Sequence, residues 1–259
     1  MRTITRMHLT LRHILSAAGL GLAAMLPATA SELPIIAKAR AFVATEATLS
    51  SLTSVRFIAT LKIADPANPA NTKSVPLDAV FEKPDRQLLK MTIDDRTEIT
   101  GLDGYESWQL IQVGPDAKQR RLNILPPART RRLLAETWEN LYYYRGLEQR
   151  GGRVQDLGRH TIDGVSCHKI AFIHGPTVVF TRYFDVATGR LILTETEDGR
   201  AIREEGEMTV QGVRFPRVVT TISKDAKGAS QTIVLTIERV DVNVPSPPRY
   251  FAVPTPTAP

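Results

Sequence analysis

The chain has 259 residues and a formal net charge of +6, with 33 Lys and Arg against 27 Asp and Glu. So small a basic excess argues against nucleic-acid binding, which needs a stronger and more concentrated positive field. The single cysteine, Cys167, excludes an internal disulfide, so the fold must be stabilised by packing.

The first thirty residues have the features of a secretory signal peptide. They contain three arginines and no acid, an apolar run from Ile14 to Leu26, and the cleavage sequence Ala28-Thr29-Ala30. The apolar run is shorter than the stretch of about 20 residues that a membrane-spanning helix needs. We therefore expect cleavage after Ala30 and a mature periplasmic chain with 30 basic and 27 acidic residues, a net charge of +3.

A helix is predicted from Pro34 to Leu52, because apolar residues recur there at helical spacing. The period then changes to two between Val55 and Ile63, which predicts a strand with one buried face. After a Pro- and Asn-rich loop from Ala64 to Ser74, short strand-like runs follow with turn residues between them. These runs cover residues Val75 to Phe81, Gln87 to Ile93, Thr97 to Leu102, Tyr105 to Val113 and Gln119 to Ile124.

A second helix is predicted after Pro126 and Pro127, extending to Gly146, with Leu133, Leu134, Trp138 and Leu141 at helical spacing. Strands return beyond it and are separated by short turns, most of them containing Gly. They cover Gln155 to Ile162, Ser166 to Ile173, Val178 to Asp185, Arg190 to Glu197, Ala201 to Val210, Val213 to Ser223 and Gln231 to Asp241.

The element order predicts a mainly β (α+β) domain over residues 31–244, followed by a proline-rich tail over 245–259. The connections between strands are too short for parallel crossovers, so the sheet should be antiparallel. A sheet with this many strands curls as its twist accumulates. We expect a half-open barrel whose concave apolar face is covered by the two helical segments.

The sequence contains no motif of a catalytic or metal centre. Cys167 and His168 are adjacent on a predicted strand and point to opposite faces, so they cannot share one ion. No nucleophile elbow or phosphate-binding loop is present. We therefore predict that the protein is not an enzyme and has no metal or cofactor.

Five arginines cluster around the start of the second predicted helix. Positive charge at a helix N-terminus is mildly unfavourable against the helix dipole, so a functional reason is worth considering. We predict that Arg129, Arg131 and Arg132 form a patch for an acidic partner or for lipid headgroups, with a solvated surface as the alternative.

The stretch from Val80 to Leu125 resembles the LolA/LolB-type lipoprotein carriers of Gram-negative envelopes. Val80-Phe81-Glu82-Lys83-Pro84 is similar to the family's strand that ends in a basic residue and proline. Leu88-Leu89-Lys90-Met91-Thr92 matches the second apolar strand, and Asp103-Gly104-Tyr105-Glu106-Ser107-Trp108 matches the hairpin that follows.

The resemblance implies a carrier of lipid or lipoprotein acyl chains between membranes, in an apolar cavity under a helical lid. It implies a latch at Lys83, where the family has an arginine that hydrogen-bonds to the lid and this chain has a lysine without the planar fork. The expected cavity residues are Phe57, Leu61, Phe81, Leu89, Met91, Trp108, Leu110, Leu134, Trp138 and Leu141.

The expected partners are acyl chains and proteins of the inner and outer membranes, with transient membrane contact, no nucleic acid and a monomeric state. An alternative on the same fold is an envelope sensor or interaction module that binds a protein. An envelope enzyme acting on polysaccharide or lipid ranks last, because it would need carboxylates gathered from distant parts of the sequence.

Overall fold

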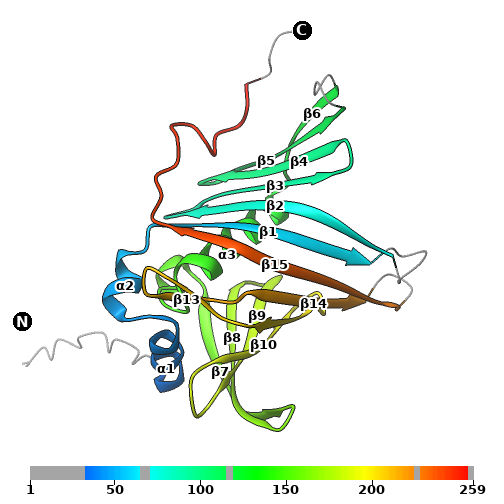
Figure 1. Cartoon of the computed structure of the whole chain (residues 1–259). Helices are drawn as coiled ribbons and strands as arrows, with labels where there is room; N and C mark the ends of the chain where they lie inside the picture. Colours follow the sequence, from blue (N-terminus) through cyan, green and yellow to red (C-terminus); the bar gives the residue numbers. More distant parts are fainter. Residues whose placement is uncertain (1–32, 65–70, 115–118, 225–227, 256–259) are drawn as a thin grey trace, which may run out of the picture. The chain divides into compact units, whose positions relative to one another are not determined.

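The computed structural model describes residues 33–64, 71–114, 119–224 and 228–255. The predicted signal peptide and most of the predicted loop from Ala64 to Ser74 lie outside the described residues. The described chain is mostly β, with a large curved antiparallel sheet that does not close into a barrel (Figure 1). This confirms the predicted fold class.

Thirteen strands form this sheet, in the order β6-β5-β4-β3-β2-β1-β15-β14-β11-β10-β9-β8-β7. The first half contains β1 (Ser54–Ala64), β2 (Thr72–Glu82), β3 (Arg86–Ile93), β4 (Arg96–Asp103), β5 (Glu106–Val113) and β6 (Gln119–Ile124). The second contains β7 (Arg153–Ile162), β8 (Val165–Gly175), β9 (Val178–Asp185), β10 (Leu191–Thr196), β11 (Ala201–Glu205), β14 (Val218–Lys224) and β15 (Ser230–Val242).

The sheet is built from two meanders joined in its middle. The chain runs outward from β1 to the edge strand β6, crosses to the opposite edge at β7 through α3 (Pro127–Leu141) and the short helix η1 (Glu148–Arg150), and returns inward to β15. The first and last strands then pair antiparallel. Because α3 connects the two edges, the topology carries it across one face of the sheet.

The predicted first helix is two helices, α1 (Pro34–Val43) and α2 (Glu46–Ser51). Ala44 is extended and ends α1, and the Thr45 hydroxyl accepts a hydrogen bond from the Thr48 amide to cap α2. An N-cap threonine satisfies one of the amides left free at a helix start, which explains why a new helix begins here. The second predicted helix is confirmed but ends at Leu141, five residues before Gly146.

Two predicted strands are each broken. The run from Ala201 to Val210 divides at Gly206, and the run from Val213 to Ser223 divides at Pro216, which cannot donate a ladder hydrogen bond. The detached pieces, β12 (Met208–Val210) and β13 (Val213–Phe215), form a separate two-stranded sheet.

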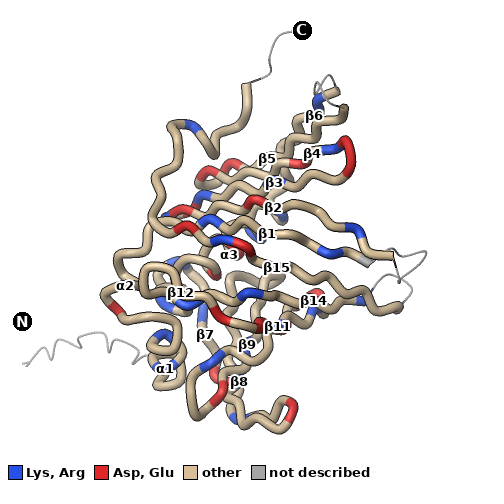
Figure 2. Tube along the Cα trace, in the orientation of Figure 1, with Lys and Arg blue, Asp and Glu red and all other residues tan. Residues whose placement is uncertain are grey.

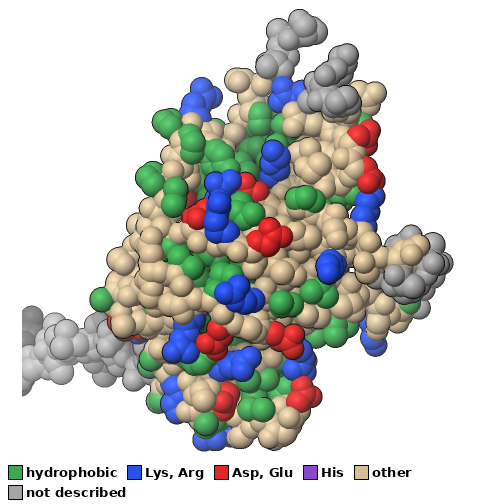
Figure 3. Space-filling view, in the orientation of Figure 1, with side chains coloured by type: hydrophobic (Ala, Val, Ile, Leu, Met, Phe, Trp, Pro, Cys, Tyr) green, Lys and Arg blue, Asp and Glu red, His purple; other side chains and the backbone are tan. Residues whose placement is uncertain are grey.

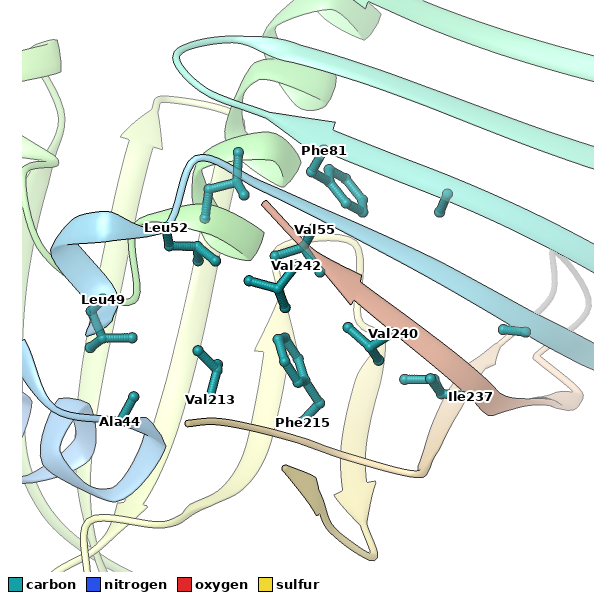
Figure 4. Close-up of a cluster of buried hydrophobic side chains, with 13 residues drawn as sticks. Ala44, Leu49, Leu52, Val55, Phe81, Val213, Phe215, Ile237, Val240 and Val242 are labelled. Carbon is teal, nitrogen blue, oxygen red and sulfur yellow. The ribbon is translucent and has the colours of Figure 1, made fainter. Parts of the chain in front are cut away.

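The central hydrophobic core lies where this hairpin meets the middle of the large sheet. Figure 4 shows Val213 and Phe215 of β13 facing side chains from α2, β1, β2 and β15. Strand alternation produces this arrangement, because Val240 and Val242 lie two residues apart and so share a face.

The opposite face of the sheet carries a second layer made by the C-terminal chain, which we call the C-terminal strap (residues 245–253). Phe251 of this strap is buried among Val80, Leu88, Trp108 and Leu110, and its carbonyl accepts a 2.9 Å hydrogen bond from the Trp108 indole. Trp108 and Leu110 therefore do not face the lid, and their predicted place in the cavity is corrected. Strand alternation puts them on the other face from Gln109 and Ile111.

Gly101 permits this layer to form, because the Trp108 indole lies directly over it in the neighbouring strand. A Cβ at position 101 would overlap the indole ring. We expect Gly101→Ala to lower the free energy of unfolding by about 2 kcal/mol, in the range typical of overpacking. Urea denaturation measures it.

The matched control is Gly175→Ala on β8, where an added methyl group meets open space. We expect it to change the free energy of unfolding by less than about 0.5 kcal/mol. Equal effects of the two substitutions would contradict the proposed packing of Trp108 on Gly101.

Charged residues are distributed over the whole described chain. Figure 2 shows acidic and basic positions interspersed along the strands and helices. On the face drawn in Figure 3, hydrophobic side chains lie in small patches among charges of both signs.

Candidate ligand cavity

A cavity of about 360 Å³ lies between the helical side of the sheet and the elements packed on it. The cavity is lined by residues of α1 and α3, of strands from both halves of the sheet, and of the segment around β13. This volume is at the lower end of the range of about 300–1,000 Å³ found for ligand pockets.

One wall of the cavity is apolar. It is formed by side chains that alternate along β1, β2, β3, β14 and β15, together with Phe215 of β13. The ring of Phe57 is central in this wall, with edge-on contacts to Phe81 at 6.1 Å and to Phe215 at 5.8 Å between centroids. The other apolar lining residues of the sheet are Leu77, Ala79, Leu89, Val219, Leu235 and Ile237.

The other wall carries charges from α3 and from β9 to β11, which the sequence analysis did not anticipate. Its ionisable residues are Arg132, Glu136, Glu139, Arg182, Arg200 and Glu204, and Arg214 lies across from them on β13. Burial raises the pKa of the Glu204 carboxyl, an effect that Arg182 and Arg190 oppose. The cavity is thus amphipathic, with an apolar wall facing a charged one.

A buried ionic group lies at the centre of the charged wall. Glu139 contacts His174 Nε2 at 2.6 Å through Oε1 and Arg182 Nη1 at 2.5 Å through Oε2. The side chains of Glu139, His174 and Arg182 are 5, 10 and 9% exposed. The Arg182 guanidinium also lies over the rings of Tyr144, at 4.7 Å, and Phe172, at 5.5 Å. Such a group is costly to desolvate, so its presence in the core calls for a functional explanation.

Arg132 does not belong to a surface patch, which corrects part of the predicted arginine cluster. It is 9% exposed, bonds to Glu136 at 3.0 Å and Glu197 at 2.6 Å, and lies over the Phe180 ring. Its position on α3 turns it toward the cavity. Arg129 and Arg131 are exposed on the same helix, and a headgroup patch at these two residues stays a prediction.

The end of α3 is held by two basic residues. Arg40 of α1, only 4% exposed, donates to the carbonyls of Tyr142 at 2.8 Å and Tyr143 at 2.6 Å. Its remaining nitrogens bind both carboxylate oxygens of Glu46, at 2.8 and 2.9 Å. Sequence reasoning missed Arg40, because 102 residues separate it from the first carbonyl that it binds.

Lys83, the predicted latch, lies at the same end of α3. Its Nζ is 5.0 Å from the centre of the Tyr142 ring, a cation–π contact. Burial and the neighbouring Arg40 charge lower the pKa of the Lys83 amine. The hydrogen bonds expected of a latch are made by Arg40, whose planar fork reaches two carbonyls and a carboxylate together.

The structure brings only some of the predicted cavity residues together. Phe57, Phe81 and Leu89 line the cavity. Leu61 and Met91 share a strand face with Phe57 and Leu89 but lie outside its lining. Trp138 and Leu141 of α3 are fully buried in separate hydrophobic clusters, and Leu134 lines a different hollow with Arg131 and Tyr105.

The two histidines of β8, the strand that carries Cys167, have separate partners. His168 contacts Asp156 at 2.7 Å on the neighbouring strand, whereas His174 binds Glu139 of α3. Cys167 is buried, and its burial raises the pKa of the thiol. Within the described residues, no three His, Cys, Asp or Glu side chains come close enough to hold a metal ion.

In the same part of the chain, no helix has the length and apolarity needed to cross a membrane.

No protein-family model and no curated protein matches the sequence. Among solved structures, the fold is similar to a LolA superfamily protein from Nitrosomonas europaea, with a TM-score of 0.56 and 13% identity over 84% of this chain and 95% of that one. It is also similar to an outer membrane lipoprotein-sorting protein domain from Vibrio parahaemolyticus, with a TM-score of 0.54 and 10% identity over 84% and 94%. The chain therefore has a LolA-like fold.

Proposed function

We propose that this chain with a LolA-like fold binds the acyl chain of a lipid or lipoprotein in the amphipathic cavity and carries it through the periplasm. The observation that supports the proposal is a cavity of about 360 Å³ with a continuous apolar wall on the inner side of an open sheet. The likeness to a lipoprotein-sorting domain supports the same class of cargo. The predicted signal peptide supports the location.

The size of the cavity favours one chain over several. A 150 Å³ cavity holds a benzene molecule, so about 360 Å³ holds roughly 14 non-hydrogen atoms on that scale. A dodecanoyl chain has this size. Each buried methylene contributes about 0.8 kcal/mol, so such a chain contributes about 9 kcal/mol before the costs of binding.

A carrier must also release its cargo. Opening the helices over the cavity consumes part of the binding free energy, which lowers the net affinity. A receptor that binds the chain more tightly can then remove it. Arg40 and Lys83 hold the C-terminal end of α3, and Arg132 holds the helix to Glu197, so opening must break contacts of this kind.

Native mass spectrometry of the protein purified from periplasm tests this proposal. We expect a bound species of acyl-lipid or lipoprotein mass that is displaced by added dodecanoic acid. Protein that is always empty and leaves added dodecanoic acid unbound would overturn it. A stoichiometric protein partner without any lipid would instead favour the interaction module.

A further inference from the structure

The charged wall of the cavity has no role in holding a purely apolar chain. A ligand that filled the cavity with hydrocarbon alone would leave the Arg182 and Glu139 charges facing apolar atoms, which is unfavourable. The lining contains four arginines and three glutamates, so positive charge exceeds negative charge in it. The wall therefore suits a ligand with a negatively charged end.

Arg182 is the arginine in this wall that is held by an ion pair, to Glu139, without a well-directed side-chain hydrogen bond. Its side chain is 9% exposed, and both Nε and Nη1 are buried without a hydrogen-bond partner. Glu139 lies close enough to balance the charge but does not accept a well-directed hydrogen bond, and its Oε2 is also unsatisfied. A buried donor without an acceptor is destabilising, so an added anion would relieve it.

The other three arginines of the lining are engaged. Arg132 donates to two glutamates, and Arg200 donates to Asp198 at 3.0 Å. Arg214 lies over the Phe42 ring and 3.6 Å from Glu207. A guanidinium presents paired N–H groups in a fixed fork that matches the two oxygens of a carboxylate. Arg182 is the member of the set that is buried, lies over two aromatic rings and lacks a well-directed side-chain hydrogen bond.

Resting on the proposed function, we propose that the cargo is a single-chain amphiphile with an anionic head, such as a fatty acid, whose carboxylate oxygens accept hydrogen bonds from Arg182. Its hydrocarbon chain extends along Phe57, Leu89 and Leu235 on the opposite wall. The capacity of roughly 14 non-hydrogen atoms accommodates a carboxylate with a chain of about 12 carbons.

The test compares dodecanoic acid with dodecan-1-ol, which has the same chain and an uncharged head. We expect calorimetric titration of the full chain to give about tenfold or greater preference for the acid, the size of a charged hydrogen bond. Butyrate, which has the head without the long chain, is expected not to bind measurably.

The variant Arg182→Gln should abolish the preference for the acid. It should lower the affinity for dodecanoic acid and leave the affinity for dodecan-1-ol within about twofold of the wild-type value. Because the single variant leaves the buried Glu139 carboxylate with only His174 beside it, the double variant Arg182→Gln/Glu139→Gln removes both charges and keeps the test usable. The control is Arg203→Gln. Arg203 lies on β11 between two cavity-lining residues, so its side chain points to the opposite face of the sheet, where it pairs with Asp163.

The outcomes separate this inference from the proposed function. Equal affinity of the wild type for acid and alcohol would overturn the anionic-head inference while supporting an acyl-chain cavity. An equal loss of affinity for both ligands in the Arg182 variants would also overturn it, because Arg182 would then have only a structural role. Binding of neither ligand would overturn both proposals.

Discussion

Leu235→Trp is expected to weaken binding of dodecanoic acid more than tenfold. Leu235 lies on β15, lines the cavity and pairs with Leu61 of β1 and Val219 of β14, so its side chain is at the centre of the apolar wall. An indole there occupies space that the acyl chain needs. Displacing three methylenes from the cavity would cost about 2.4 kcal/mol, or roughly 60-fold in affinity.

The matched control is Thr236→Trp, the next residue on the same strand. Its side chain points to the other face, because successive strand residues alternate. We expect the control to bind dodecanoic acid like the wild type in calorimetric titration. Equal binding by Leu235→Trp and the wild type would show that the acyl chain lies elsewhere.

Arg40→Ala is expected to lower the free energy of unfolding by about 2–4 kcal/mol, because it leaves two carbonyl acceptors without their donor. Arg40 joins α1 to Glu46 of α2 and to the carbonyls that follow α3, so one side chain connects all three helices. Alanine would leave the Tyr142 and Tyr143 carbonyls without this donor. Urea denaturation followed by circular dichroism measures the change.

Two further variants identify the cause of that loss. Arg40→Lys keeps the charge without the planar fork and should recover only part of the stability. Arg145→Gln removes the exposed second partner of Glu46, at 2.7 Å, and should cost less than about 1 kcal/mol. A loss below 1 kcal/mol for Arg40→Ala would contradict a central role for this residue.

Local patterns in the sequence predicted most of the fold. The alternation from Val55 to Ile63 and the turn residues between later runs correctly indicated antiparallel hairpins, and β6 and β9 have the predicted bounds. The spacing of Leu133, Trp138 and Leu141 correctly indicated a helix with a buried side. These features depend on residues close in sequence, so one sequence suffices to detect them.

The assignment of faces was less successful, although strand alternation contained part of the answer. Leu88 and Leu89 are adjacent and must point to opposite faces, and the register pairs Leu88 with Gly101 and Gly101 with Trp108. The Trp108 side chain therefore points to the same face of the sheet as Leu88, the face covered by the C-terminal strap. The register between strands, which this argument needs, was not available from one sequence.

Apart from Arg132, which was predicted in a headgroup patch, the charged wall could not be predicted. Glu139, Arg182 and Glu204 come from α3, β9 and β11 and share no motif or spacing. The pairing of β9, β10 and β11 brings Arg182 and Glu204 together, and the crossing of α3 over the sheet adds Glu139. The same holds for Arg40, whose partners after α3 are distant in sequence.

The most direct test of the account is anomalous diffraction from crystals grown with dodecanoic acid that carries bromine on its terminal carbon. We expect one bromine peak in the cavity among Phe57, Leu89 and Leu235, with density continuing toward Arg182. A cavity without a peak, in crystals where the ligand is bound only on the outer surface, would contradict the claim that this hollow holds the cargo.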